Sequence, residues 1–286
     1  MKIIVIGTGY VGLVQGAGLA SLGHDIVCVD VDVAKIEKLR TGEIPFFEIG
    51  LSDLVKQGID AGRLQFLTTL AEAFKIEPQV IFIAVGTPSD EKGNADLRFV
   101  EAVARELGQV IMGPMVVVEK STVPVGTGIK IIEWIGRSDV TVASNPEFLR
   151  EGSAVADFMK PDRIVLGVDS DSARDLLLEV YAGIESPKLV MNRESAELAK
   201  YAANTMLASR LSLMNELANI ADVVGANILE VEKVLASDPR IGAKFLRSGA
   251  GFGGSCFPKD VLALESTARL AGYEPRLIAP IIDVNN

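Results

Sequence analysis

The sequence predicts an α/β fold in which a doubly wound, mainly parallel sheet is followed by an all-helical domain with one long central helix. Short β-rich runs alternate with helical segments over roughly the first two thirds of the chain, a pattern typical of parallel sheets with crossover helices. From residue 193, some thirty residues follow without proline and with glycine only near the end, as one long helix requires.

The expected elements follow in chain order. Strands are expected at residues 2–7, 25–30, 64–69, 80–88, 116–122, 140–147 and 163–168. The long helix is expected at 193–226, and two further helices at 227–237 and 259–272. We therefore expect an α/β domain over residues 1–192 and a helical domain over residues 193–286.

The composition excludes several classes of function for this protein. The 286 residues are 49% hydrophobic, enough for a sizeable core, and the net charge of −10 argues against nucleic acid or an anionic membrane as a partner. No apolar run approaches the ~18 residues of a membrane span. A single histidine excludes multi-histidine metal sites, so no metal is expected. Its position, His24 in a turn just before the second strand and away from the strand ends that gather ligands, argues against a Ser-His-Asp triad. Two cysteines fit a reducing compartment, and we expect the cytoplasm.

The clearest motif is "GTGYVG", which places Gly7, Gly9 and Gly12 directly after the first expected strand and at the start of a helix. In a Rossmann-type domain, these glycines allow a tight turn, close approach of a pyrophosphate, and packing of helix on strand. Asp30 ends the second strand, where a carboxylate accepts hydrogen bonds from a ribose and repels a 2′-phosphate. The pattern predicts NAD rather than NADP.

Two further strand ends are expected at the same crevice. The segments are "VGTP" at residues 85–88 and "KSTVP" at residues 120–124. Open α/β sheets bind their ligands at the carboxyl ends of the strands, so both segments are candidates for cofactor contacts.

On the long helix, Lys200 and Asn204 lie four residues apart and therefore share one face. Together they could polarise a carbonyl or an alkoxide. The alternative is a solvated helix face, which is where lysines usually lie.

The most informative thiol is Cys256, in the glycine-rich segment "GAGFGGSCFPKD". Pro258 suits the first turn of a helix, so the thiol should lie at a helix N-terminus with Lys259 near it, and both features favour the thiolate. Asp260, one turn on, could hold a water or a proton. The alternative is a structural cysteine, which we expect for Cys28 in the middle of a strand.

A hydride acceptor combined with a nucleophilic thiol suggests oxidation of an alcohol, through an aldehyde and a thioester, to an acid. Hydrolysis of the thioester needs a base, and "SNPEFLREGSA" offers Glu147 and Glu151 at a strand end. The alternative is that these are ordinary loop acids.

With these residues assembled, the chain resembles the UDP-glucose/GDP-mannose dehydrogenase family over its whole length. The resemblance rests on "VIGTGYVGLV", "GEIPFFEIGL", "IAVGTPS", "KSTVPVGTG", "SNPEFLREGSA", "FMKPDRIVLG", "ELAKYAANTML", "DPRIGAKFL" and "GFGGSCFPKD". The last is the most specific of them. The "NPEFLREGSA" and "GAKFL" segments are more similar to the UDP-glucose enzymes than to those for GDP-mannose or UDP-N-acetylhexosamines.

The resemblance implies roles for individual residues. Cys256 would be the nucleophile, Lys200 and Asn204 would stabilise oxyanions, Asp260 and Thr122 would hold the catalytic water, and Glu147 would be the base. The cofactor NAD would contact Gly7, Gly9, Tyr10, Val11, Gly12, Asp30, Lys35, Gly86, Thr87, Pro88, Ser121, Thr122 and Glu151. The substrate would contact Phe148, Leu149, Arg150, Glu151, Lys200, Asn204, Arg240, Phe245, Leu246, Phe252, Gly253 and Lys259, with Arg240 reaching the site of a neighbouring subunit.

By the same resemblance, residues 1–192 would bind NAD and residues 193–286 would supply catalysis and a homodimer interface along the central helix. The family continues into a C-terminal UDP-binding domain to which nothing in this sequence corresponds. We expect NAD binding to survive without that domain, and the central helix to expose apolar surface.

The activity implied is NAD-dependent, four-electron oxidation of UDP-glucose to UDP-glucuronate. The alternatives are a dehydrogenase for GDP-mannose or a UDP-N-acetylhexosamine, a one-hydride β-hydroxyacid dehydrogenase in which Cys256 has no role, and a non-catalytic NAD-binding protein.

Overall fold

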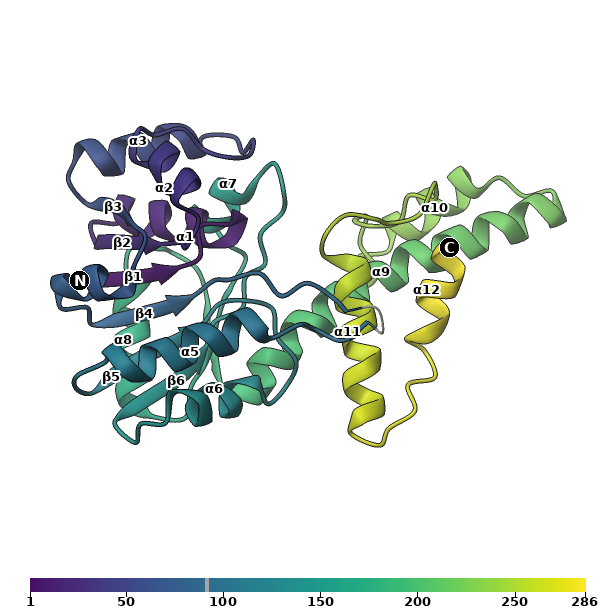
Figure 1. Cartoon of the computed structure of the whole chain (residues 1–286). Coiled ribbons are helices and arrows are strands. Elements are labelled where there is room, and N and C mark those ends of the chain that lie inside the picture. Colours follow the sequence, from purple (N-terminus) through teal and green to yellow (C-terminus); the bar gives the residue numbers. More distant parts are fainter. Residues whose placement is uncertain (91–92) are drawn as a thin grey trace. The chain divides into compact units, whose positions relative to one another are not determined.

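The computed structural model describes residues 1–90 and 93–286, which form two compact units (Figure 1). Unit 1 consists of Met1–Thr87 and Leu97–Leu198, and unit 2 consists of Pro88–Asp96 and Ala199–Asn286. Each unit therefore draws on two separate stretches of the chain.

The described part of unit 1 contains an eight-stranded sheet with the strand order β3-β2-β1-β4-β5-β6-β7-β8. The strands are β1 (Lys2–Ile6), β2 (Asp25–Val29), β3 (Leu64–Leu67), β4 (Val80–Ile83), β5 (Met115–Glu119), β6 (Val140–Ser144), β7 (Ile164–Gly167) and β8 (Lys188–Met191). All pairs are parallel except β6 with β7, which meet antiparallel at Ser144 and Gly167. The expected sheet is confirmed, with β8 as an additional edge strand.

Helices cover both faces of this sheet (Figure 1). They are α1 (Tyr10–Ser21), α2 (Val33–Arg40), α3 (Leu51–Asp60), α4 (Leu70–Ala73), the 3₁₀ turn η1 (Phe74–Ile76), α5 (Arg98–Val110), α6 (Thr127–Ile135), α7 (Ala154–Met159) and α8 (Asp171–Val180). Alternate residues of a strand face opposite sides of the sheet, so Ile3 and Val5 join the core beside α1 while Ile4 and Ile6 join the core of the other face. The order of the sheet reverses direction between β1 and β4, the place where doubly wound sheets bind ligands.

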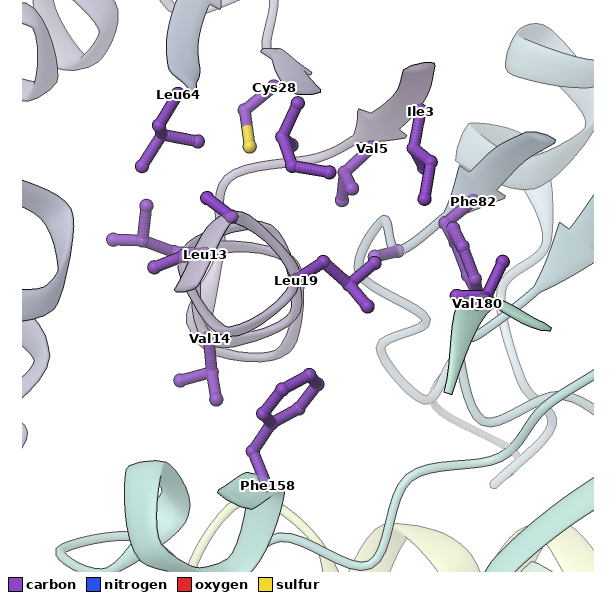
Figure 2. Packing of buried hydrophobic residues seen from close by; sticks show 14 of the residues in the cluster. Ile3, Val5, Leu13, Val14, Leu19, Cys28, Leu64, Phe82, Phe158 and Val180 are labelled. Atoms are coloured by element: carbon purple, nitrogen blue, oxygen red, sulfur yellow. The ribbon is translucent and has the colours of Figure 1, made fainter. Parts of the chain in front are cut away.

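Helix α1 is buried along most of its length and is unusually rich in small residues. Figure 2 shows it almost end-on, with Cys28 and Leu64 on one side and Phe158 on the other. A Cβ on Gly16 would lie 2.4 Å from Cys28 Sγ, and one on Gly18 would lie 2.2 Å from the ring of Phe158. These two glycines therefore let the helix pack closely between the sheet and α7.

The long central helix is confirmed as α9 (Arg193–Val224), which is 32 residues long. The other helices of unit 2 are α10 (Ile228–Ser237), α11 (Phe257–Leu270) and α12 (Ala279–Asn285). A small core joins α9, α11 and α12 through Ala208, Val261 and Ile281.

The short stretch Pro88–Asp96 belongs to unit 2, where it contacts α11. Ser266 donates a hydrogen bond to the side-chain oxygen of Asn94. Gly93 has a φ of +81°, and a Cβ there would lie 3.1 Å from Leu262, so glycine suits both the backbone and the space. In the part of the chain described, no helix combines the length and the apolar character needed to cross a bilayer.

Candidate functional site

The glycine motif forms a tight turn between β1 and α1. Gly7 has a φ of +98°, and a Cβ there would lie 2.5 Å from the carbonyl oxygen of Ala84. A Cβ on Gly12 would lie 1.9 Å from the carbonyl oxygen of Gly7. Gly9 differs, because a Cβ there would meet nothing within 4 Å. Packing thus requires glycine at positions 7 and 12, because a Cβ at either would clash. At position 9 the absence of a side chain leaves open space next to the backbone.

That open space lies at the N-terminus of α1, where Gly9 is the N-cap. No side chain caps this end with a hydrogen bond, and the first turn carries no acidic residue in the structure described. The first N–H groups of the helix are therefore available to an anion, and the helix dipole favours negative charge there. This arrangement fits the pyrophosphate of a dinucleotide.

Asp30 follows β2 and carries several donors on its carboxylate. Oδ2 accepts hydrogen bonds from the backbone N–H of Thr8 at 2.9 Å and its hydroxyl at 2.7 Å, and pairs with Lys35 Nζ at 2.8 Å. Burial alone would raise the pKa of Asp30, but these donors outweigh it and the pKa is lowered. Asp30 is therefore a fixed anion, of the kind that accepts hydrogen bonds from ribose hydroxyls.

The ends of β4 and β5 are linked directly, as their motifs predict. Ser121 Oγ donates to the carbonyl of Val85 at 2.8 Å, and Thr87 Oγ1 donates to the carbonyl of Thr122 at 2.8 Å. A Cβ on Gly86 would meet nothing within 4 Å. The structure thus brings together the expected cofactor contacts of both strand ends.

The loop after β6 carries the candidate base. In the parallel strands β5 and β6, Glu119 pairs with Ser144. Thr122 and Glu147 each follow three residues later, so both lie beyond the carboxyl ends of these strands. Glu147 is buried, and its carboxylate accepts the N–H of Leu149.

Two contacts hold the rest of this loop. The Arg163 guanidinium lies 3.8 Å from the centre of the Phe148 ring. Arg150 is paired with Asp157, which accepts from its backbone N–H at 2.9 Å and from its side chain. The side chain of Arg150 is thus engaged by an acid in the first turn of α7, the helix that follows its loop.

In unit 2, the candidate residues of α9 are buried. Lys200 is 3% exposed and Asn204 is 6% exposed, so they do not lie on a solvated face of the helix. Asn204 Nδ2 donates to Asp260 Oδ2 at 2.6 Å, and Lys259 Nζ pairs with Asp260 Oδ1 at 2.6 Å. The fold therefore brings Asn204, Lys259 and Asp260 into direct contact, although Asn204 and Asp260 are 56 positions apart.

The thiol of Cys256 lies at the N-terminus of α11. Cys256 is the N-cap residue, its carbonyl accepts the first helical bond from the N–H of Asp260 at 2.9 Å, and Pro258 occupies the first turn as predicted. Cys256 is half-buried, whereas Cys28 is fully buried. Burial raises the pKa of Cys28 to about 12, so Cys28 is an inert core thiol, as predicted.

The loop between α10 and α11 carries the other expected substrate contacts of unit 2, apart from those on α9 and α11. A pocket of about 440 Å³ is lined by Leu207, Arg210 and residues 241–245. Phe245 has a φ of +62°, an uncommon conformation for a bulky side chain. Leu246 and Phe252 are buried, a Cβ on Gly253 would meet nothing within 4 Å, and Arg240 is exposed and paired with Asp238.

Sequence reasoning missed two residues that shape these loops. Arg210 donates to the carbonyls of Ile241 and Gly242, at 2.8 and 2.7 Å, and so holds the wall of the pocket. Glu48 accepts hydrogen bonds from the loop after β6. Glu48 could have been found, because it lies in "GEIPFFEIGL", one of the segments on which the family resemblance rests. Nothing in the sequence distinguishes Arg210 from the other charged residues of α9.

The chain matches two family models. Residues 1–185 match the NAD binding domain of the UDP-glucose/GDP-mannose dehydrogenase family, and residues 194–286 match the central domain of the same family. The boundary between the two matches lies near the start of α9.

Named relatives agree with the models. A UDP-glucose 6-dehydrogenase of Rhizobium meliloti is 49% identical over the whole chain, which spans 68% of that protein. The UDP-glucose 6-dehydrogenase TuaD of Bacillus subtilis is 47% identical over 99% of the chain, which spans 62% of that protein.

A solved structure extends the agreement to the fold. The UDP-glucose dehydrogenase of the hyperthermophilic archaeon Pyrobaculum islandicum superimposes with a TM-score of 0.96 at 42% identity, covering 99% of this chain and 67% of that one. With a glycine turn in the NAD binding domain, a buried Asn204–Asp260 pair in the central domain and a thiol at the N-terminal end of α11, the chain belongs to the UDP-glucose/GDP-mannose dehydrogenase family.

Proposed function

We propose that this protein oxidises the C6 hydroxyl of UDP-glucose to the carboxylate of UDP-glucuronate, in two successive oxidations. The observation that carries the proposal is the cluster of unit 2, in which Cys256 caps α11 and Asp260 of the same helix bonds Asn204. NAD, when bound, accepts one hydride in each oxidation. A one-step alcohol dehydrogenase has no need of the thiol.

The residues of this chain supply the remaining chemistry. In the first oxidation C6 loses a hydride and its hydroxyl loses a proton, and Lys200 and Asn204 donate to the resulting aldehyde oxygen. The sulfur of Cys256 then bonds C6 while a proton adds to the aldehyde oxygen, which gives a thiohemiacetal. Loss of a second hydride from C6, and of the hydroxyl proton to solvent, leaves a thioester. Water attacks C6 of the thioester, and Glu147 takes a proton from that water. The bond between C6 and sulfur then breaks, the sulfur takes up this proton to restore the thiol, and the acid formed loses its own proton to solvent as the carboxylate. Asp260 and Thr122 hold this water.

The cofactor is held by the turn at Gly9, by Asp30 and by the ends of β4 and β5. The charge and hydrogen bonding of Asp30 favour NAD, because its carboxylate repels a 2′-phosphate. Lys35 contacts the same carboxylate at 2.8 Å and completes the ribose side of the site.

UDP-glucose is the substrate best supported, because the relatives at 47–49% identity are named for it. GDP-mannose and UDP-N-acetylhexosamines are the alternatives. A panel of these sugar nucleotides at equal concentration separates them, since a site fitted to one sugar discriminates by its buried polar contacts. Faster NAD reduction with any other sugar than with UDP-glucose would reject this choice of substrate.

The partner we propose is a second copy of the chain, docked along α9. Met206, Leu213 and Ile220 are exposed and lie seven residues apart, which places them on one stripe of the helix. Leu213→Glu should shift the protein to monomer in sedimentation. Glu216→Gln, at an exposed polar position of the same helix, is the control and should not. We propose the cytoplasm as its location, because two cysteines are too few for a disulfide framework and fit a reducing compartment.

The decisive experiment measures NADH formed per UDP-glucose consumed by the purified chain. We expect a ratio near two, lost in Cys256→Ser and kept in Cys28→Ala, which removes the other thiol. A ratio near one that survives Cys256→Ser would reject the thioester mechanism and favour a β-hydroxyacid type of dehydrogenase. Bound NAD with no turnover of any sugar nucleotide would reject the activity for this chain.

A further inference from the structure

Glu48 is a buried acid for which the reaction above has no use. It lies between α2 and α3 in "GEIPFFEIGL" and is 3% exposed. Oε2 accepts the backbone N–H of Gly152 at 2.8 Å, and Oε1 accepts that of Ala154 at 2.9 Å. A buried carboxylate is costly unless donors satisfy it, and here the donors come from the loop after β6.

A third donor connects Glu48 to the dinucleotide turn. The Tyr10 hydroxyl lies 2.6 Å from Glu48 Oε2 and 2.9 Å from the carbonyl oxygen of Arg150. Burial, and then the hydrogen bond and charge of Glu48, raise the pKa of Tyr10, so this hydroxyl keeps its proton and remains a donor. Its one proton is shared between the two acceptors.

These contacts bracket Glu151. The carbonyl of Arg150 is held just before it, and the N–H of Gly152 just after it. Tyr10 is the first residue of α1 and directly follows Gly9, the N-cap at which the proposed function places the pyrophosphate. The same carboxylate therefore ties the turn that receives the cofactor to the loop that carries Glu147 and Glu151.

We propose that Glu48 is a positioning residue that, together with Tyr10, fixes the loop 148–153 against the dinucleotide turn and so sets the place of Glu151. The inference rests on the proposed function for the role of that loop in the reaction. It adds Glu48, which contacts neither of the expected ligands in that scheme, to the residues on which turnover depends.

The chemistry favours a carboxylate at this position. Two backbone N–H groups need two acceptor oxygens, and an amide offers only one, so Glu48→Gln must turn its NH₂ toward Gly152 or Ala154. The loop's other contacts, Arg163 on Phe148 and Asp157 on Arg150, lie before Glu151. On its far side Ser153 bonds to Arg150 and Asp157, within the same loop and α7, whereas the Glu48 contacts tie the backbone to a segment about a hundred positions away in the sequence.

The test compares Glu48→Gln, Tyr10→Phe and the double variant with wild type, with Glu43→Gln as the matched control. Glu43 lies in the same segment, but its side chain is exposed. Amide hydrogen exchange is followed at residues 148–154 and in α1, and NAD affinity, kcat and KM are measured at a temperature well below unfolding.

For Glu48→Gln we expect the amides of Gly152 and Ala154 to exchange about tenfold faster or more, with the interior of α1 unchanged. We expect kcat to fall by about tenfold or more while NAD affinity stays within about threefold. Tyr10→Phe should show a smaller effect, and the double variant less than the product of the two single effects, because both act through one contact.

Unchanged exchange at Gly152 and Ala154 would overturn the proposal, and so would faster exchange with unchanged kcat, because the contact would then be structural only. If wild type reduces no NAD with any sugar nucleotide, the proposed function fails independently. In that case, amide hydrogen exchange measured with and without saturating NAD tests whether Glu48 positions the loop. Protection of residues 148–154 by NAD in wild type but not in Glu48→Gln would support it, and equal protection in both would overturn it.

Discussion

The side-chain amide of Asn204 donates a 2.6 Å hydrogen bond to the carboxylate of Asp260, which is 1% exposed. The other oxygen of the same carboxylate holds Lys259. Two helices that are distant in the sequence therefore share one buried acid.

Removing the charge of that acid should damage turnover more than binding. In Asp260→Asn, Lys259 loses its ion-pair partner and an amide faces the amide of Asn204. We expect kcat for UDP-glucose to fall by about 100-fold or more, the range typical of a displaced acid–base group, with NAD affinity unchanged. Stopped-flow NADH formation measures the first quantity and calorimetry the second. Glu274→Gln, at an exposed position, is the control and should retain full activity.

Two glycines of the dinucleotide turn should respond in opposite ways to the same change. Gly9→Ala adds a methyl group to open space, so we expect the melting temperature to change little and NAD affinity to fall by about tenfold or more. In Gly12→Ala the methyl group would lie 1.9 Å from a carbonyl oxygen, so the fold itself should be strongly destabilised. Equal NAD affinity in Gly9→Ala and wild type would show that the open space over Gly9 is not the cofactor site.

Cofactor choice should depend on Asp30. Asp30→Ser removes the carboxylate and leaves Lys35 without its anionic partner, so a 2′-phosphate would meet a cation instead of an anion. We expect the ratio of NADP to NAD affinity to rise by about tenfold or more. Isothermal titration with both cofactors measures it. Asp53→Ser, at an acid in the first turn of α3, should leave the ratio as it is.

The buried acid at the end of β5 should make stability fall with rising pH. Burial raises the pKa of Glu119 well above its ordinary range, the nearby Glu197 adds to the rise, and Ser121 offsets only part of it. Between the unfolded and folded pKa values the native state holds the extra proton, so the free energy of unfolding falls by up to about 1.4 kcal/mol per pH unit from this group. Glu119→Gln should flatten that slope in urea titrations from pH 5 to 8, and an unchanged slope would contradict this assignment.

The sheet could be predicted because its strands are buried on both faces and appear as continuous apolar runs. Strand β8 escaped prediction because it is an edge strand of four residues, in which Leu189 and Val190 are both nearly half exposed and no alternation appears. Helix α12 escaped because Pro280 looks like an interruption, whereas it lies in the first turn of the helix. The assignment of Pro88–Asp96 to unit 2 depends on contacts with α11, which no local pattern shows.

In the candidate site, residues within one motif could be predicted and residues joined across the chain could not. The turn at Gly7, Gly9 and Gly12 follows from spacing and steric limits. Glu48 and Gly152 are 104 positions apart, and their bond depends on how α3 and α7 pack on α1. The burial of Lys200 also required the fold, because helical periodicity alone does not separate it from a solvated lysine.

The composition of unit 2 from two distant stretches has a consequence for synthesis on the ribosome. Asn94 is translated early, but Ser266, its hydrogen-bond partner, follows 172 positions later. At typical elongation rates the stretch around Asn94 emerges on the order of 10–30 s before its partner helix. During that interval Asn94 cannot yet receive the hydrogen bond of Ser266, because Ser266 and the rest of α11 have not yet been made. The arrival of α11 then completes the second folding unit, and a gene fragment that starts at residue 199 would encode it only in part.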